Sequence, residues 1–187
     1  RAYAYGSELL VKKTAGRIRG WVGYTYAETN RHIIKHGWYQ PKYDRTHTLN
    51  MVGDLEILDG LHFSTSLQAA SGQPFTPPVG RYDQWYAQHG AFGHYWTYNP
   101  GFLVDDKNSA RLSPYFRLDI GLKQNKTFYG LPYQRFFQLV NVTNHINPLT
   151  HQYRNKTNRL TGETLGLQRA EVPMFPFFFT MGFRIEF

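Results

Sequence analysis

The sequence predicts an all-β protein that is an antiparallel transmembrane β-barrel, and three observations lead to this prediction. Apolar and polar residues alternate with a period of two in segments of about ten residues, the length with which a tilted strand crosses a bilayer. Aromatic residues make up 17% of the 187 residues and charged residues only 18%. A membrane barrel needs aromatic girdles outside and polar side chains inside, so this balance fits it. Short turns also alternate with long connections.

Seven segments carry the alternation and are predicted to be neighbouring strands: 3–12, 18–26, 46–57, 61–69, 115–123, 133–143 and 175–187. The last is the clearest, because its odd-numbered positions are apolar enough to face lipid. They are Phe175, Phe177, Phe179, Met181, Phe183, Ile185 and Phe187. The sixth is ambiguous, since Phe136 and Phe137 fall on opposite faces.

The connections differ in length on the two sides of the predicted sheet. Residues 14–16, 58–60 and 129–132 form tight turns rich in Gly, Asp or Pro, as hairpins require. Residues 30–44, 72–112 and 144–173 are expected to form long loops. Outer-membrane barrels have short periplasmic turns and long extracellular loops. We therefore expect the last strand, and with it Phe187, to end on the periplasmic side.

Other classes of protein fit the sequence less well. A soluble β-sandwich also alternates, but it would expose fewer aromatics and would not place all its long connections on one side. The net charge of +8 is scattered, with no basic run longer than Lys12-Lys13, which argues against nucleic-acid binding. There is no cysteine, phosphate loop or nucleophile elbow. We therefore expect no enzyme activity, no cofactor and no metal site.

Polar and aromatic residues in the connections and strands suggest specific contacts. Asp44 and Arg45 could form an ion pair, with each other or across strands, or could be solvated loop charges. Arg117 and Asp119 lie one strand period apart, and we expect them to pair. The longest connection contains exposed-type aromatics that could stack on a sugar ligand, although packing among themselves is the simpler expectation. The ligand candidates are Trp85, Tyr86, Tyr95 and Trp96.

Four motifs carry a family resemblance: YDRTHTLN at 43–50, ASGQPFT at 70–76, RLSPYFRLD at 111–119 and NVTN at 141–144. In this order they resemble the C-terminal barrel region of TonB-dependent outer-membrane receptors, particularly the Bacteroidetes-like group that carries a carboxypeptidase-regulatory-like domain. The resemblance covers nearly all of residues 1–187. It implies that these are the last seven strands of a barrel of the class with about 22 strands and a plugged lumen, the plug and earlier strands lying elsewhere.

The resemblance also implies a function and partners. It implies a receptor of the bacterial outer membrane that takes up a scarce ligand with energy from the TonB complex, which it would contact through the plug. An alternative is a structural barrel subunit that scaffolds a larger outer-membrane complex without transport. Expected partners are outer-membrane lipid, the barrel-assembly machinery and possible surface lipoproteins or other outer-membrane subunits. The assembly machinery would read the final strand, with Phe183, Ile185 and Phe187 as the signal.

Overall fold

The computed structural model describes residues 1–90, 93–158, 160 and 164–185, and every regular element among them is a β-strand. All strand pairs are antiparallel. Across these residues we find no helix with the length and apolar character needed to cross a membrane. The prediction of an all-β, antiparallel protein is therefore confirmed.

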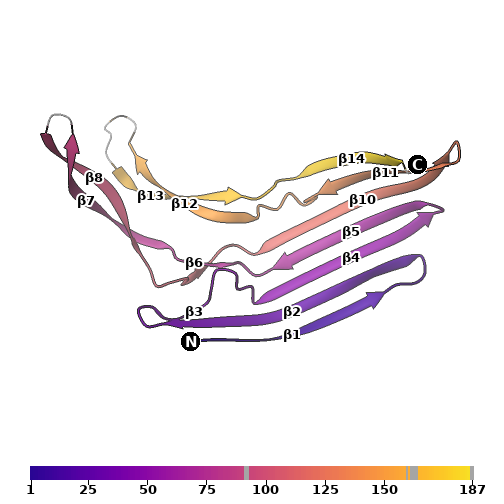
Figure 1. Ribbon diagram of the computed structural model, residues 1–187, viewed down its shortest axis with the longest axis horizontal. Coiled ribbons are helices and arrows are strands. Elements are labelled where there is room, and N and C mark those ends of the chain that lie inside the picture. The colour runs from indigo at the N-terminus through magenta and orange to yellow at the C-terminus, as the bar shows by residue number, and fades with distance from the viewer. Residues whose placement is uncertain (91–92, 159, 161–163, 186–187) are drawn as a thin grey trace.

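The main sheet has eight strands, and seven of them follow one another in chain order (Figure 1). The eighth, β3 (Gly37–Tyr39), pairs only with the end of β2. The predicted strand order is confirmed. The seven are β1 (Ala2–Lys13), β2 (Ile18–Ile33), β4 (His47–Leu58), β5 (Leu61–Ala70), β10 (Tyr115–Phe128), β11 (Leu131–Val140) and β14 (Phe178–Ile185).

Tight turns join these strands at one end of the sheet, as predicted. Tyr129 and Gly130 both have positive φ, 50° and 79°, which is the geometry of a two-residue hairpin turn whose twist matches the flanking strands. Gly60 has a φ of 71° in the turn between β4 and β5. A side chain other than glycine is strained in this backbone conformation, so the glycines there stabilise the turns.

The long connections lie at the other end of the sheet, as predicted, but they contain strands that the sequence analysis did not predict. Residues 72–112 contain a short pair, β6 (Pro74–Phe75) with β9 (Ala110–Arg111), and a hairpin of β7 (Pro78–Gly90) and β8 (Gly93–Val104). Residues 144–173 contain a hairpin of β12 (Pro148–Thr157) and β13 (Thr164–Pro173). Both hairpins project beyond the main sheet (Figure 1). Their inner pairing satisfies backbone groups that a loop would leave to water.

Several predicted strand boundaries also shift, and β2 and β10 continue to Ile33 and Phe128, beyond the predicted ends at residues 26 and 123. The last strand begins at Phe178 and not at Phe175, because Pro176 has no N–H to donate to a ladder. The sixth ends at Val140, since Asn141 has a φ of 54° and leaves the extended conformation. Phe187 lies outside the described residues.

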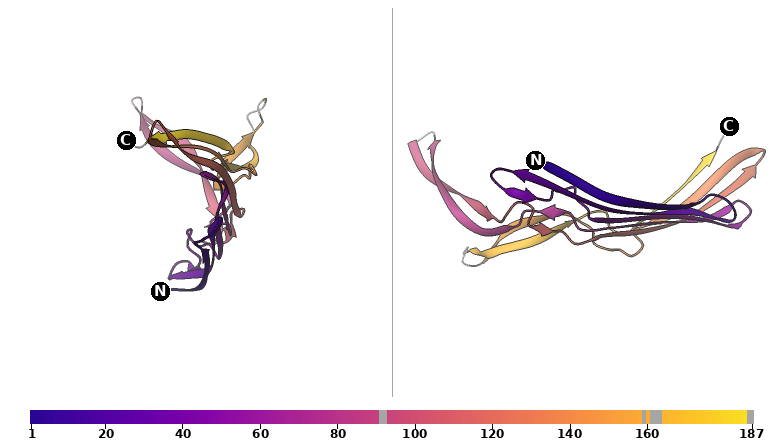
Figure 2. Two further views of the ribbon diagram at one scale, coloured as in Figure 1. Left: turned by 90° about the vertical axis from the view of Figure 1, so that its right-hand side faces the viewer. Right: turned by 90° about the horizontal axis from the view of Figure 1, so that it is seen from below.

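The main sheet is a single curved layer (Figure 2). Its two outer strands, β1 and β14, do not pair with each other among the described residues, so the sheet is open. The concave side is the side that faces the viewer in Figure 1. Among the described residues the buried hydrophobic side chains are Leu112 and Val140. The sheet therefore has no hydrophobic core on either face.

Candidate functional site

One face of the main sheet carries continuous rows of apolar side chains. Directly opposed residues in an antiparallel sheet point to the same face, so the strand registers define each row. One row crosses six strands as Ile18, Leu55, Phe63, Leu122, Phe137 and Met181. A second crosses five strands as Val11, Val22, Met51, Leu67 and Leu118. The apolar positions that the period-two pattern predicts are therefore aligned from strand to strand across the sheet.

The side chains of this apolar face are exposed or half-exposed, most strongly in the outer strands β1 and β14. Phe183 is 76% exposed, Met181 71%, Leu9 63% and Phe179 60%. Fully burying one side chain of this kind contributes about 1.5 to 3 kcal/mol, so leaving the whole face in water is costly. Soluble monomers rarely expose a continuous apolar surface of this extent. The face therefore needs a covering layer that these strands do not provide.

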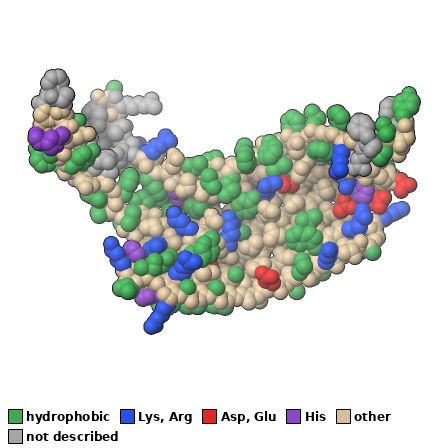
Figure 3. All heavy atoms as spheres, viewed as in Figure 1, with side chains coloured by type: hydrophobic (Ala, Val, Ile, Leu, Met, Phe, Trp, Pro, Cys, Tyr) green, Lys and Arg blue, Asp and Glu red, His purple; other side chains and the backbone are tan. Residues whose placement is uncertain are grey.

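The opposite face is polar and is the concave one. Gln68, Ser66, Ser64 and His62 of β5 face this side together with Arg117, Asp119 and Lys123 of β10. Figure 3 looks onto this face, and basic and acidic side chains lie across the sheet. Among them, Asp54 accepts a hydrogen bond from Arg19 (2.9 Å) and lies 3.1 Å from His62 Nδ1. A polar concave face and an apolar convex face are the arrangement of a barrel wall around a polar interior.

The ambiguous sixth segment is resolved by these faces. Phe137 lies on the convex face opposite Leu122 and Met181. Phe136 lies on the concave face opposite Gly182, where its ring covers the glycine so closely that an added Cβ would be 2.8 Å from it. An aromatic ring over a cross-strand glycine supports the strand pair and compensates for the missing side chain.

The predicted pair of Arg117 and Asp119 forms within β10. Arg117 Nε donates to both carboxylate oxygens of Asp119 at 2.9 Å. Asp119 is 6% exposed and also accepts a hydrogen bond from the backbone N–H of Asn141 at 2.9 Å. The carboxylate therefore joins β10 to the end of β11, and its role is structural.

Asp44 does not pair with Arg45, and it is not a solvated loop charge. It is 3% exposed and accepts hydrogen bonds from Arg111 (2.7 Å) and from the backbone N–H of Thr29 (2.9 Å). Arg45 instead lies over the ring of Tyr115, 5.4 Å from its centroid. The ion pair that sequence analysis left open is therefore formed across 67 residues.

Arg111 is the centre of this cluster. Besides Asp44, it donates to the backbone oxygen of Gly72 (2.8 Å), to Gln40 Oε1 (2.6 Å) and to Thr46 Oγ1 (3.1 Å). A planar guanidinium with several donors suits such a set of acceptors. It ties the base of the β7–β8 hairpin to the chain between β3 and β4.

The four motif segments meet at this end of the sheet. Ser71 N donates to His47 O (2.9 Å), Leu112 N donates to Gln73 O (2.9 Å), and Asp44–Arg111 and Asp119–Asn141 complete the contacts. At Gly72 an added Cβ would lie 1.7 Å from the backbone oxygen of Leu112. Only glycine allows this approach. These contacts join the four motif segments into one cluster at this end of the sheet, which we call the rim.

Asn147 was missed by sequence analysis, although it belongs to the same rim. It is 3% exposed, accepts from Phe116 N and donates to Phe116 O, both at 2.8 Å. Its side-chain amide therefore forms with Phe116 the two hydrogen bonds that the backbone of a neighbouring strand would form. Asn144 Oδ1 similarly accepts from Phe177 N at 3.1 Å. The spacing of Asn141, Asn144 and Asn147 was the available signal, since asparagine often pairs with backbone groups outside helices.

The ligand candidates lie on the β7–β8 hairpin and are divided between its two faces. Trp85 and Trp96 share one face with Ala87 and with the pair His89 and His94, whose rings are tilted by 59° and have centroids 3.8 Å apart. Tyr86 and Tyr95 lie on the other face. All four candidates are exposed, from 43% for Tyr86 to 72% for Trp96. The hairpin therefore presents two separate aromatic strips and not one cluster.

The assembly-signal residues follow the pattern predicted for the final strand. Phe183 and Ile185 lie on the convex face, opposite Arg135 and Tyr133 of β11, and are 76% and 43% exposed. Their partner in the prediction, Phe187, is outside the described residues. In the described part of the chain no three His, Cys, Asp or Glu residues are grouped to hold a metal ion.

Neither protein-family models nor curated proteins nor solved structures give a match to this chain. The features that characterise the protein are those of its sheet, which is a single curved antiparallel layer with an apolar convex face, a polar concave face and hairpins at one end.

Proposed function

We propose that this sheet is a section of the wall of a β-barrel in the bacterial outer membrane. The observation that carries the proposal is the convex apolar face, whose rows are in register over six and five strands and whose side chains are exposed or half-exposed, behind a polar concave face. The alternating stretch of β5 from Leu61 to Ala69 is nine residues long, within the range of about 9 to 11 residues with which a strand tilted by about 45° crosses a bilayer. Lipid is the layer that covers it.

We further propose that the barrel belongs to a receptor of the TonB-dependent type. The motif resemblance supports this, and so does the way in which the four motif segments join at one rim. The other strands, and a plug that contacts the TonB complex, would come from polypeptide outside these 187 residues. Uptake would be transport without covalent chemistry, and the projecting hairpins would face the outside, where ligand or a surface lipoprotein arrives.

Membrane fractionation tests the first step. The protein should sediment with the outer membrane, resist extraction by alkaline carbonate and need detergent for recovery. It should also migrate differently on a gel with and without heating, as assembled barrels do. Recovery as a monomer in buffer without detergent would overturn the proposal, because a soluble protein would have to bury the convex face.

Crosslinking tests the second step without knowledge of the ligand. If the receptor proposal holds, the protein in whole cells should crosslink to TonB, and the crosslink should vanish when TonB is deleted. A protein that is assembled in the outer membrane but never crosslinks, and that purifies with stoichiometric partners, would favour the scaffold alternative.

A further inference from the structure

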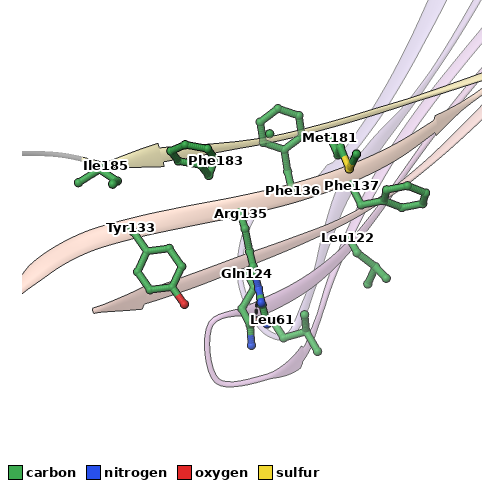
Figure 4. A pocket seen from close by; sticks show the side chains of 11 residues that line it. Leu61, Leu122, Gln124, Tyr133, Arg135, Phe136, Phe137, Met181, Phe183 and Ile185 are labelled. Atoms are coloured by element: carbon green, nitrogen blue, oxygen red, sulfur yellow. Dashed lines mark hydrogen bonds between the residues drawn. The ribbon is translucent and has the colours of Figure 1, made fainter. Parts of the chain in front are cut away.

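An apolar hollow of about 910 Å³ lies on the convex face near the short turns. Its lining comes from β5, β10, β11 and β14, and Figure 4 shows Leu61, Leu122 and Arg135 pointing to the same side of the sheet. Ligand sites commonly range from about 300 to 1,000 Å³, so the hollow can hold an acyl chain. On the convex face its walls are Leu61, Leu122, Tyr133, Phe137, Met181, Phe183 and Ile185, with Gln124 and Arg135 as polar members. Phe136 and Gly182, which face the concave side, complete the lining.

Two cations lie at the short-turn end of this hollow on the same face. Gln124 opposes Arg135 and Lys126 opposes Tyr133, so Lys126 is the diagonal neighbour of Arg135. Diagonal neighbours lie about 7 to 8 Å apart, close enough for one phosphate group to reach both side chains.

The charge of this pair is not neutralised by the described part of the chain. Arg135 donates from Nε (2.7 Å) and Nη2 to Gln124 Oε1, which is a neutral acceptor. The acidic residues of β4 at this end, Asp54 and Glu56, oppose Arg19 and His62 and so face the concave side. Asp59, in the turn between β4 and β5, is exposed and forms no ion pair with either cation. The convex strand positions at this end are therefore basic, next to an apolar hollow.

We propose that this hollow binds an anionic phospholipid, with the phosphate on Arg135 and Lys126 and an acyl chain against Leu122 and Phe137. The proposal rests on the membrane location proposed above and adds a specific lipid site to it. Charge complementarity selects the occupant: a second copy of the chain would bring the same two cations against each other, whereas a phosphate diester offers the opposite charge beside two apolar chains. Tyr133, whose phenol suits a membrane interface, lies on the same face, directly opposite Lys126 and two residues from Arg135.

Lipid binding to the protein in detergent micelles tests the site, with the number of bound lipids counted by native mass spectrometry. The probes are dioleoylphosphatidylglycerol, dioleoylphosphatidylcholine and soluble glycerol 3-phosphate. The expected result is a preference for phosphatidylglycerol that falls about fivefold in Arg135→Gln and again in the double variant with Lys126→Gln, since a basic residue near anionic lipid contributes about 1 kcal/mol. The matched control is Lys123→Gln. It removes one positive charge from the concave face of β10, the strand that also carries Lys126, and should leave the preference unchanged.

Several outcomes would overturn the proposal. Equal binding of the two lipids, or an equal loss in Lys123→Gln, would remove the site. Competition by glycerol 3-phosphate would mean that the cations bind free phosphate, and a dimer that excludes lipid would mean that a second copy covers the hollow. A detergent-requiring protein with no preference contradicts only this inference, whereas a detergent-free soluble monomer contradicts the membrane proposal as well.

Discussion

Phe179→Arg is the substitution that most directly tests which face of the sheet meets lipid. Phe179 lies on the convex face opposite Leu139 and is 60% exposed. Its ring stacks with Phe137, with centroids 6.2 Å apart. Phe179 is the second residue of β14, and its row runs through Leu139 to Ile120, which lies near the middle of β10.

The expected cost follows from these contacts. An arginine on the lipid face near the bilayer midplane costs about 2 to 4 kcal/mol, and loss of the aromatic pair adds about 0.5 to 1.5 kcal/mol. We therefore expect Phe179→Arg to lower the free energy of unfolding by about 3 to 5 kcal/mol. If the same face were in water, the arginine would be solvated, and exposed substitutions usually change stability by less than about 0.5 kcal/mol.

The assay is reversible unfolding in urea of the protein inserted in lipid vesicles. The matched control is Thr180→Arg, one residue further along β14, which places the same charge on the concave face opposite Gln138. That variant should cost less than about 1 kcal/mol, because the side chain reaches water in a polar interior. Equal costs for the two variants, or a smaller cost for Phe179→Arg, would refute the assignment of the faces.

Four further predictions concern other parts of the sheet. Leu118→Arg on the convex face should cost about 2 to 4 kcal/mol in the same titration, while Lys123→Gln on the concave face should cost little; the reverse order would require a different register. Arg111→Gln should destabilise the rim by about 3 to 5 kcal/mol, because it leaves the Asp44 carboxylate buried without a cation, and proteolysis of the hairpin base should become faster. Gly72→Ala should lower the melting temperature, since the added Cβ would lie 1.7 Å from Leu112 O; an unchanged melting temperature would mean that this contact is absent. Phe187→Asp should reduce the fraction of heat-modifiable, assembled protein far more than the stability of what assembles, and equal assembled fractions would remove the insertion signal.

Strand positions and faces could be predicted because they depend on local sequence. The alternation in β4 and β5 is enough to place Met51 and Leu67 on one face, and the register of the two strands then puts them opposite each other. The pair of Arg117 and Asp119 was predictable for the same reason, since both residues lie on one strand. A period-two pattern contains this information without knowledge of the neighbours.

The rim could not be predicted in the same way, because its contacts join distant segments. Nothing near Asp44 in the sequence indicates that Arg111 will be its partner. Asn147 replaces a strand at the edge of β10, which depends on where the connection folds back. The hairpin of β7 and β8 was assigned to a loop because its many glycines and polar residues weaken the alternation. Its aromatic side chains and backbone pairing nevertheless favour strands.

The contact between Gly72 and Leu112 has a consequence for how this protein can vary. The chain leaves β5 and returns to β10 at a single point, closed by the hydrogen bond of Leu112 N to Gln73 O and by Arg111 on Gly72 O. The residues between Gln73 and Arg111 do not alter the pairing of β5 with β10, because these hydrogen bonds hold the two ends of the segment together. Hairpins of other lengths and sequences could therefore be grafted between Gln73 and Arg111, and the same main sheet could carry many different projecting segments.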